Sequence, residues 1–128
     1  MATDPKDTRP TVPQYVLLVE DNMIIALDTE EILEQIGVER VEVESNVKGA
    51  LATIARGAPD FAILDYNLDE ESCEPVASEL SARGVPFILA TGHSQDFKAL
   101  EALGAIGVMT KPYNRAKIEQ ALVEQGAG

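Results

Sequence analysis

Four short apolar runs divide this 128-residue chain, and each leads into a polar or charged side chain. The runs and the residues after them are 16–19 with Glu20 and Asp21, 61–64 with Asp65, 87–90 with Thr91, and 106–109 with Thr110 and Lys111. A short continuous apolar run is typical of a parallel strand that is buried on both faces. Because parallel strands end along one edge of their sheet, we expect three carboxylates, a hydroxyl and an ammonium to converge there.

Helical patterns alternate with these runs along the chain. Strands are expected over 15–19, 40–44, 61–64, 85–90 and 106–109. Helices are expected over 23–36, from Asn46 to about Arg56, from Ser72 or Glu74 to about Arg83, over 95–103 and over 114–124. Strict alternation implies parallel pairing with right-handed crossovers, hence a doubly wound α/β domain with helices on both faces of the sheet. In such sheets ligands bind beyond the carboxyl ends of the strands.

The charge and the cysteine content of the chain limit the kinds of molecule that it is expected to bind. The chain is 45% hydrophobic and 25% charged, as an ordinary globular domain is, and its formal net charge is -12 at pH 7. An acidic surface repels phosphate backbones and anionic lipids, so we expect no direct binding to nucleic acid or to a membrane. Cys73 is the only cysteine, which excludes a disulfide framework and a thiolate metal cluster within the chain.

Neither end of the chain shows the hydrophobic pattern of a strand or a helix. Residues 1–13 contain mixed charge and three prolines but no signal-peptide core, so they are expected to form a flexible leader. We expect the folded domain to cover 14–125, a short tail to cover 126–128, and the protein to be cytoplasmic.

The carboxylates at the predicted strand ends suit phosphoryl chemistry. Asp65 is placed where its carboxylate could attack a phosphorus centre, although an Asp that simply begins a loop is common. Glu20 and Asp21 would form with it a patch of like charges that a cation would stabilise. Mg²⁺ prefers such oxygen ligands and bridges to phosphate oxygens. The alternative for Asp21, or for Asn22, is a capping role at the next helix.

The remaining two strand ends offer groups that stabilise developing negative charge. Lys111 would bring a positive charge and Thr91 a hydroxyl donor to the phosphoryl oxygens. Taken singly, such a lysine is usually solvated and such a threonine usually serves a turn. Pro112 restricts Lys111 to an extended backbone, which would help to hold it in place.

These residues, in this order, resemble the receiver domain of two-component response regulators from about Tyr15 to Glu124. The motifs that carry the resemblance are Val19-Glu20-Asp21, Asp65, Ala90-Thr91-Gly92 and Thr110-Lys111-Pro112-Tyr113. The resemblance implies a flavodoxin-like sheet of order 2-1-3-4-5, and a receiver domain over 14–125.

The resemblance also implies a role for each residue of the site. Asp65 would be the phosphoacceptor, with Thr91 and Lys111 holding the phosphoryl group. The implied magnesium ligands are Asp21, Asp65, the backbone carbonyl of Asn67, and Glu20 through a metal-bound water.

Three departures from the family pattern concern switching. Val108 stands where receivers commonly carry a Tyr or Phe, three residues before the lysine. The segment 86–93 resembles the Pro-Phe-x-Phe-Ala-Thr-Gly-Tyr subfamily of stand-alone receivers, with Leu89 in place of the second Phe and His93 in place of the Tyr. His93 and Val108 are therefore candidate modulators of switching. The alternative for His93 is an exposed loop residue with no role. The loop after Asp65 lacks the Met-Pro and later Gly that are common in larger receivers.

The sequence thus predicts a single-domain response regulator, not an enzyme in the ordinary sense. Its donor would be a sensor histidine kinase or a histidine phosphotransfer protein, and its output a contact with a downstream protein or a relay step. One alternative is a pseudo-receiver that binds a partner without phosphorylation. Another is a small Mg²⁺-dependent phosphohydrolase with an Asp nucleophile, although Asn67 occupies the position of the second carboxylate that those enzymes favour.

Overall fold

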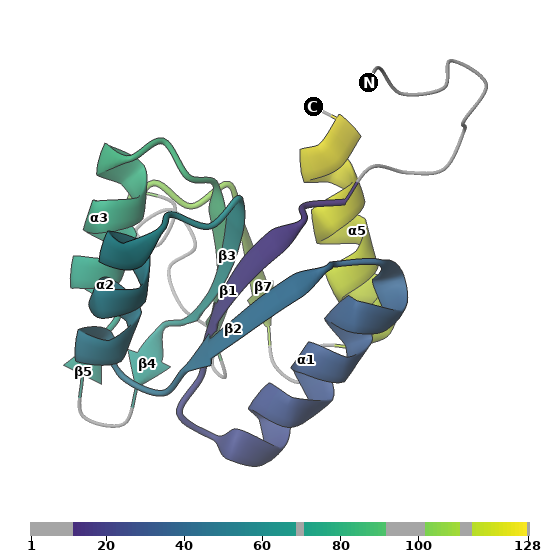
Figure 1. Ribbon diagram of the computed structural model, residues 1–128, viewed down its shortest axis with the longest axis horizontal. Coiled ribbons are helices and arrows are strands. Elements are labelled where there is room, and N and C mark those ends of the chain that lie inside the picture. The colour runs from purple at the N-terminus through teal and green to yellow at the C-terminus, as the bar shows by residue number, and fades with distance from the viewer. Residues whose placement is uncertain (1–11, 69–70, 92–101, 111–113, 128) are drawn as a thin grey trace.

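The computed structural model describes residues 12–68, 71–91, 102–110 and 114–127, which form a parallel sheet between two layers of helices (Figure 1). The sheet has five strands in the order β2-β1-β3-β6-β7. Their bounds are β1 Tyr15–Val19, β2 Arg40–Glu44, β3 Phe61–Asp65, β6 Phe87–Thr91 and β7 Gly107–Thr110. Counted among these strands alone, the order is 2-1-3-4-5, which confirms the predicted fold class.

A second, two-stranded sheet lies in the connection after β3. It pairs β4 (Asn67–Leu68) with β5 (Glu71–Ser72) in antiparallel fashion. The sequence did not predict this hairpin, because two-residue strands are too short to show a hydrophobic period.

The helices cover both faces of the main sheet. They are α1 Met23–Ile36, α2 Val47–Arg56, α3 Glu74–Ala82 and α5 Arg115–Ala127. Helices α2 and α3 lie on one face, and α1 and α5 lie on the other (Figure 1). The helix predicted over 95–103 falls largely outside the described residues, and its last two positions belong to a turn.

Asparagine side chains begin the first two helices. Asn22 Oδ1 accepts hydrogen bonds from the backbone N–H groups of Ile24 and Ile25 at 3.0 and 3.2 Å. Asn46 Oδ1 accepts one from Gly49 at 2.7 Å. These caps satisfy N–H groups that have no partner within the helix. Of the two candidate caps for α1, the structure therefore selects Asn22.

The core consists of two clusters on opposite faces of the sheet. Leu17 and Val19 belong to the cluster under α2 and α3, whereas Val16 and Leu18 belong to the cluster under α1 and α5. Successive strand residues point to opposite faces, so a strand covered on both sides must be apolar throughout. Every residue of β3 and β6 is buried, and both strands are apolar up to their last residues, Asp65 and Thr91.

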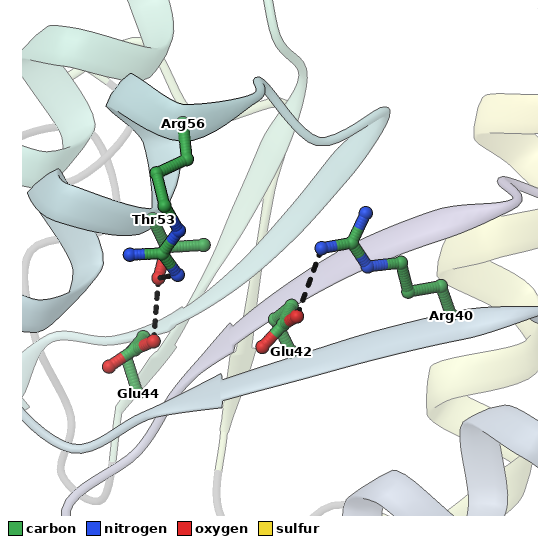
Figure 2. A network of polar contacts seen from close by, with 5 residues as sticks. All are labelled: Arg40, Glu42, Glu44, Thr53 and Arg56. Carbon is green, nitrogen blue, oxygen red and sulfur yellow. Dashed lines mark hydrogen bonds and ion pairs between the residues drawn. The ribbon is translucent and has the colours of Figure 1, made fainter.

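Strand β2 lies at an edge of the sheet and alternates apolar and charged residues, as predicted. Figure 2 shows its charged side chains, where Arg40 pairs with Glu42 at 3.0 Å. Glu44 Oε2 accepts a hydrogen bond at 2.6 Å from the Thr53 hydroxyl, to which Arg56 donates at 3.2 Å. These contacts tie the end of β2 to helix α2.

Two strands begin later than predicted. The strand expected over 85–90 is Phe87–Thr91, and the one expected over 106–109 is Gly107–Thr110. Val85 instead lies just after α3 and is bonded to its end, because its N–H donates to the carbonyl of Leu80 at 2.9 Å. Both strands also end one residue later than predicted, so Thr91 and Thr110 are the last residues of their strands rather than the first residues after them.

Candidate functional site

Three carboxylates meet at the carboxyl ends of β1 and β3. Oxygen atoms of Glu20, Asp21 and Asp65 all lie within 4.8 Å of one another. Strands β1 and β3 are paired up to Val19 and Leu64, which brings the residues that follow side by side. The structure therefore confirms that these three predicted site residues come together, as parallel pairing requires.

Two of the carboxylates are withdrawn from water. Only 1% of Glu20 and 5% of Asp65 are exposed, and Asp21 is the most exposed of the three. Burying a carboxylate is costly unless it is compensated by partners or by a cation. Hydrogen-bond partners or a bound cation must therefore offset both the cost of burying Glu20 and Asp65 and the repulsion among the three carboxylates.

Glu20 is held from both sides by the backbone. Its N–H donates to the carbonyl of Glu44 at 3.0 Å, which extends the pairing of β1 with β2 by one residue. Its Oε2 accepts a hydrogen bond from the N–H of Asn22 at 3.2 Å. The same Asn22 caps α1, so the start of that helix and the position of the Glu20 carboxylate are fixed together.

Thr91 lies at the same edge of the sheet, one strand further along. Asp65 is aligned with Ala90 of β6, and the next residue is Thr91, which is fully buried. Thr91 is in turn aligned with Thr110 of β7, and the carbonyl of Thr110 accepts a hydrogen bond from Lys117 Nζ at 3.4 Å. Lys111 directly follows Thr110 but lies outside the described residues.

The other predicted positions are only partly described. Asn67 lies two residues after Asp65, where its backbone pairs with Ser72 in the hairpin. Val108 of β7 is aligned with Leu89 of β6, and it packs half-buried against the cluster under α2 and α3. His93 lies outside the described residues.

Cys73 is buried beside this site without taking part in ionic chemistry. Burial, assisted by the negative charge of Asp65, raises the pKa of its thiol to about 12. The thiol is therefore protonated at neutral pH, which makes it a poor nucleophile and a poor thiolate ligand while it stays buried.

The sequence analysis missed the hairpin that carries Asn67. A glycine or asparagine turn signal would have pointed to it, but Asp69 and Glu70 connect its two strands. The available signal was indirect, since Leu68 is an isolated apolar residue that the structure buries.

The chemistry of the cluster matches a hard divalent cation. Mg²⁺ prefers carboxylate and carbonyl oxygens, keeps several waters and bridges to phosphate oxygens. The three acidic side chains offer one such oxygen each, all close enough to share an ion. With a hydroxyl at the neighbouring strand end, the site is suited to binding a metal together with a phosphoryl group.

The family of the chain follows from its sequence. Residues 16–123 match the family described as the response regulator receiver domain. The chain belongs to this family. Receiver domains are signalling domains of two-component systems, and the match runs from the second residue of β1 into α5.

Curated relatives include two transcriptional regulatory proteins. PdtaR of Mycobacterium tuberculosis is 27% identical over 119 residues, which cover 91% of this chain and 58% of the relative. LytR of Staphylococcus aureus is 28% identical over 109 residues, which cover 83% of this chain and 44% of the relative. The chain thus spans about half the length of the curated relatives it matches.

Solved structures of receiver domains share the fold of this chain. The receiver domain of a Pseudomonas aeruginosa sensor histidine kinase, which has a magnesium ion in its active-site cleft, is 25% identical with a TM-score of 0.79. The match covers 90% of this chain and 98% of that one. A CheY-like receiver domain from Methanospirillum hungatei has a TM-score of 0.80 at 24% identity, over 89% of this chain and 94% of that one.

None of the helices in the described part of the chain combines the length and the apolar character that crossing a membrane requires.

Proposed function

We propose that this receiver domain accepts a phosphoryl group on Asp65 from a phosphohistidine, in a reaction that depends on Mg²⁺. The observation that carries the proposal is the cluster of Glu20, Asp21 and Asp65 at the carboxyl edge of the sheet. The donor would be a sensor histidine kinase or a histidine phosphotransfer protein, as is general for the family.

The transfer uses groups that lie at adjacent strand ends. A carboxylate oxygen of Asp65 forms a bond to phosphorus while the P–N bond of the phosphohistidine breaks, and its electron pair returns to the imidazole. Thr91 and Lys111 donate hydrogen bonds to the phosphoryl oxygens and stabilise their charge. Asp21, Asp65 and the carbonyl of Asn67 would hold Mg²⁺, with Glu20 acting through a water. When bound, the ion neutralises the carboxylates and the incoming phosphoryl group.

The burial of the acidic residues favours this function over that of a passive binding module. A module that only contacts a partner gains nothing from two buried carboxylates, which cost stability. Local choices that oppose folding are expected mainly at functional sites. The retained Asp65 and its acidic neighbours therefore support a receiver that is phosphorylated.

A protein donor needs a surface beside the site, and α1 offers one. Met23, Ile24 and Leu27 are large apolar side chains at the start of this helix, and they are 51%, 81% and 59% exposed. They follow the acidic cluster directly in sequence, so a partner that covers them would bring its phosphohistidine near Asp65. Exposed apolar groups gathered on one face commonly mark a protein contact.

We expect Ile24→Glu to reduce phosphotransfer from a phosphohistidine-bearing protein at least about tenfold, because a charge at the contact must be desolvated. Labelling by acetyl phosphate should be unchanged, since this small donor needs no docking. Ile106→Glu is the control, because Ile106 is also an isoleucine that is more than half exposed (53%), and it precedes β7 rather than lying on α1. Equal transfer to wild type and to Ile24→Glu would show that the donor docks elsewhere.

The downstream role is proposed more broadly. The acidic chain would act in the cytoplasm through contact with a downstream protein or by passing the phosphoryl group on. Val108 stands at the position where receivers commonly carry a Tyr or Phe that rotates on activation. A valine has no ring to rotate, so switching would use other residues. His93 is the candidate closest in sequence to Thr91.

Amide spectra with beryllium fluoride test the proposed function directly. We expect fluoroberyllate and Mg²⁺ together to shift the resonances around Asp65, Thr91 and Lys111, because the fluoride complex mimics the acyl phosphate. Mg²⁺ alone should shift a smaller set near Glu20 and Asp21, and fluoride without beryllium is the control. A folded protein whose spectrum does not respond would contradict the proposal.

A further inference from the structure

The hairpin between β3 and α3 fixes the main chain immediately after Asp65. The N–H of Tyr66 donates to the carbonyl of Ala90 at 2.9 Å, and the carbonyl of Tyr66 accepts from the N–H of Cys73 at 3.3 Å. Asn67 then pairs with Ser72, and Leu68 with Glu71. The chain thus turns back on itself between the candidate phosphoacceptor and the start of α3.

A hairpin with strands of two residues needs support from outside itself. An isolated two-stranded hairpin is at best marginally stable in water, even when its strands are longer than two residues, unless one of its faces packs against other elements. Here the support comes from the core. Leu68 is 1% exposed and Cys73 is fully buried, and both belong to the cluster under α2 and α3.

Leu68 is the apolar anchor of the first strand of this hairpin. It adjoins Asn67, whose carbonyl is a metal ligand under the proposed function, and it lies three residues after Asp65. The burial of Leu68 fixes the chain on one side of Asn67, and the hydrogen bonds of Tyr66 fix it on the other. The main chain of Asn67 is thereby held between two attached neighbours.

We propose that Leu68 is a positioning residue for the metal site, because its burial holds the backbone of Asn67 in place beside Asp65. This inference rests on the proposed function, in which that backbone binds Mg²⁺. A carbonyl that is ordered before the ion arrives binds more tightly than one that must be ordered during binding. Groups that orient metal ligands typically contribute 10- to 100-fold in affinity.

The test is a titration of the full chain with MgCl₂, followed by amide shifts or calorimetry. Leu68→Ala should weaken Mg²⁺ binding about tenfold, the lower end of that range. Leu68→Met, which keeps the volume and the apolar character, should restore most of the affinity. The matched control is Leu80→Ala, which removes the same atoms from a fully buried residue of the same cluster, but from α3. It should lower stability and leave the affinity for Mg²⁺ unchanged.

A second readout follows the hairpin itself. In the absence of metal, the buried Cys73 thiol should react faster with a thiol reagent in Leu68→Ala than in wild type. Unchanged Mg²⁺ affinity in Leu68→Ala would overturn the inference, and so would an equal loss of affinity in Leu80→Ala. If Leu68→Ala does not fold, Leu68→Val replaces it with a smaller expected loss. Failure of the wild-type chain to bind Mg²⁺ at all would instead overturn the proposed function, and the inference with it.

Discussion

Asp65→Asn should reduce phosphoryl labelling by acetyl phosphate to background. The amide has nearly the shape of the carboxylate but lacks the anionic oxygen that attacks phosphorus. Asp65 is buried among two other carboxylates, so the change removes a charge from an acidic site and should leave the protein folded. Intact mass spectrometry in the presence of Mg²⁺ measures the label, and its sensitivity to alkali identifies an acyl phosphate.

The matched control is Asp28→Asn, which makes the same chemical change on an exposed residue of α1. Its labelling should equal that of the wild type. Persistent labelling of Asp65→Asn, with stability in alkali, would place the acceptor on another side chain. If Asp65→Asn loses both its labelling and its folded spectrum, Asp65→Glu replaces it as the test variant. That variant keeps a carboxylate but shifts its position, so it should fold and still label poorly.

The sequence was sufficient to predict most elements because burial and capping are local patterns. The bounds of β1, α1 and β2 agree with those predicted, since each apolar or amphipathic segment is limited by charged residues, a glycine or a cap. Asn46 was expected to begin the second helix, and it does. Alternation of strands and helices then restricts the topology to few arrangements, which is why the strand order was also confirmed.

The parts that sequence did not predict depend on contacts between distant residues. The hairpin of β4 and β5 is supported by Leu68 and Cys73, which pack in the core under α2 and α3. No periodic pattern in the local sequence indicates this packing. The start of β6 was misplaced because Val85, although apolar, bonds to the end of α3. Such competition between a strand and a helix end is decided only in three dimensions.

The candidate site divides in the same way. Convergence of Glu20, Asp21 and Asp65 was predictable, because parallel strands must end together. The difference between a buried Glu20 and a more exposed Asp21 was not, because it depends on the carbonyl of Glu44 and the N–H of Asn22. The roles of Lys111 and His93 stay predictions from the sequence, since both residues lie outside the part of the chain that the structure describes.

Asp21→Asn should have opposite effects on stability with and without Mg²⁺. In the absence of the ion, three carboxylates within 4.8 Å repel one another, so removing one charge should stabilise the fold by about 1 kcal/mol. Asp21 is the most exposed of the three, which makes it the least disruptive one to replace. Its loss should also remove an anionic ligand and weaken Mg²⁺ binding about tenfold or more.

Thermal unfolding in chelator and in excess Mg²⁺ measures both effects. A ligand present at 100 times its dissociation constant stabilises the folded state by about 2.7 kcal/mol, and a tenfold weaker site gains about 1.3 kcal/mol less. The variant should therefore unfold at a higher temperature than the wild type in chelator and at a lower temperature than the wild type in excess Mg²⁺. Asp28→Asn, on the exposed face of α1, should show neither change.

The crossover separates a metal site from a merely acidic surface. General damage by the substitution would lower stability in both conditions, and simple relief of repulsion would raise it in both. Only a carboxylate that is unfavourable alone and favourable beside a cation produces opposite signs. An Asp21→Asn protein that gains as much from Mg²⁺ as the wild type would show that the ion is bound without Asp21, and the proposed ligand set would be wrong.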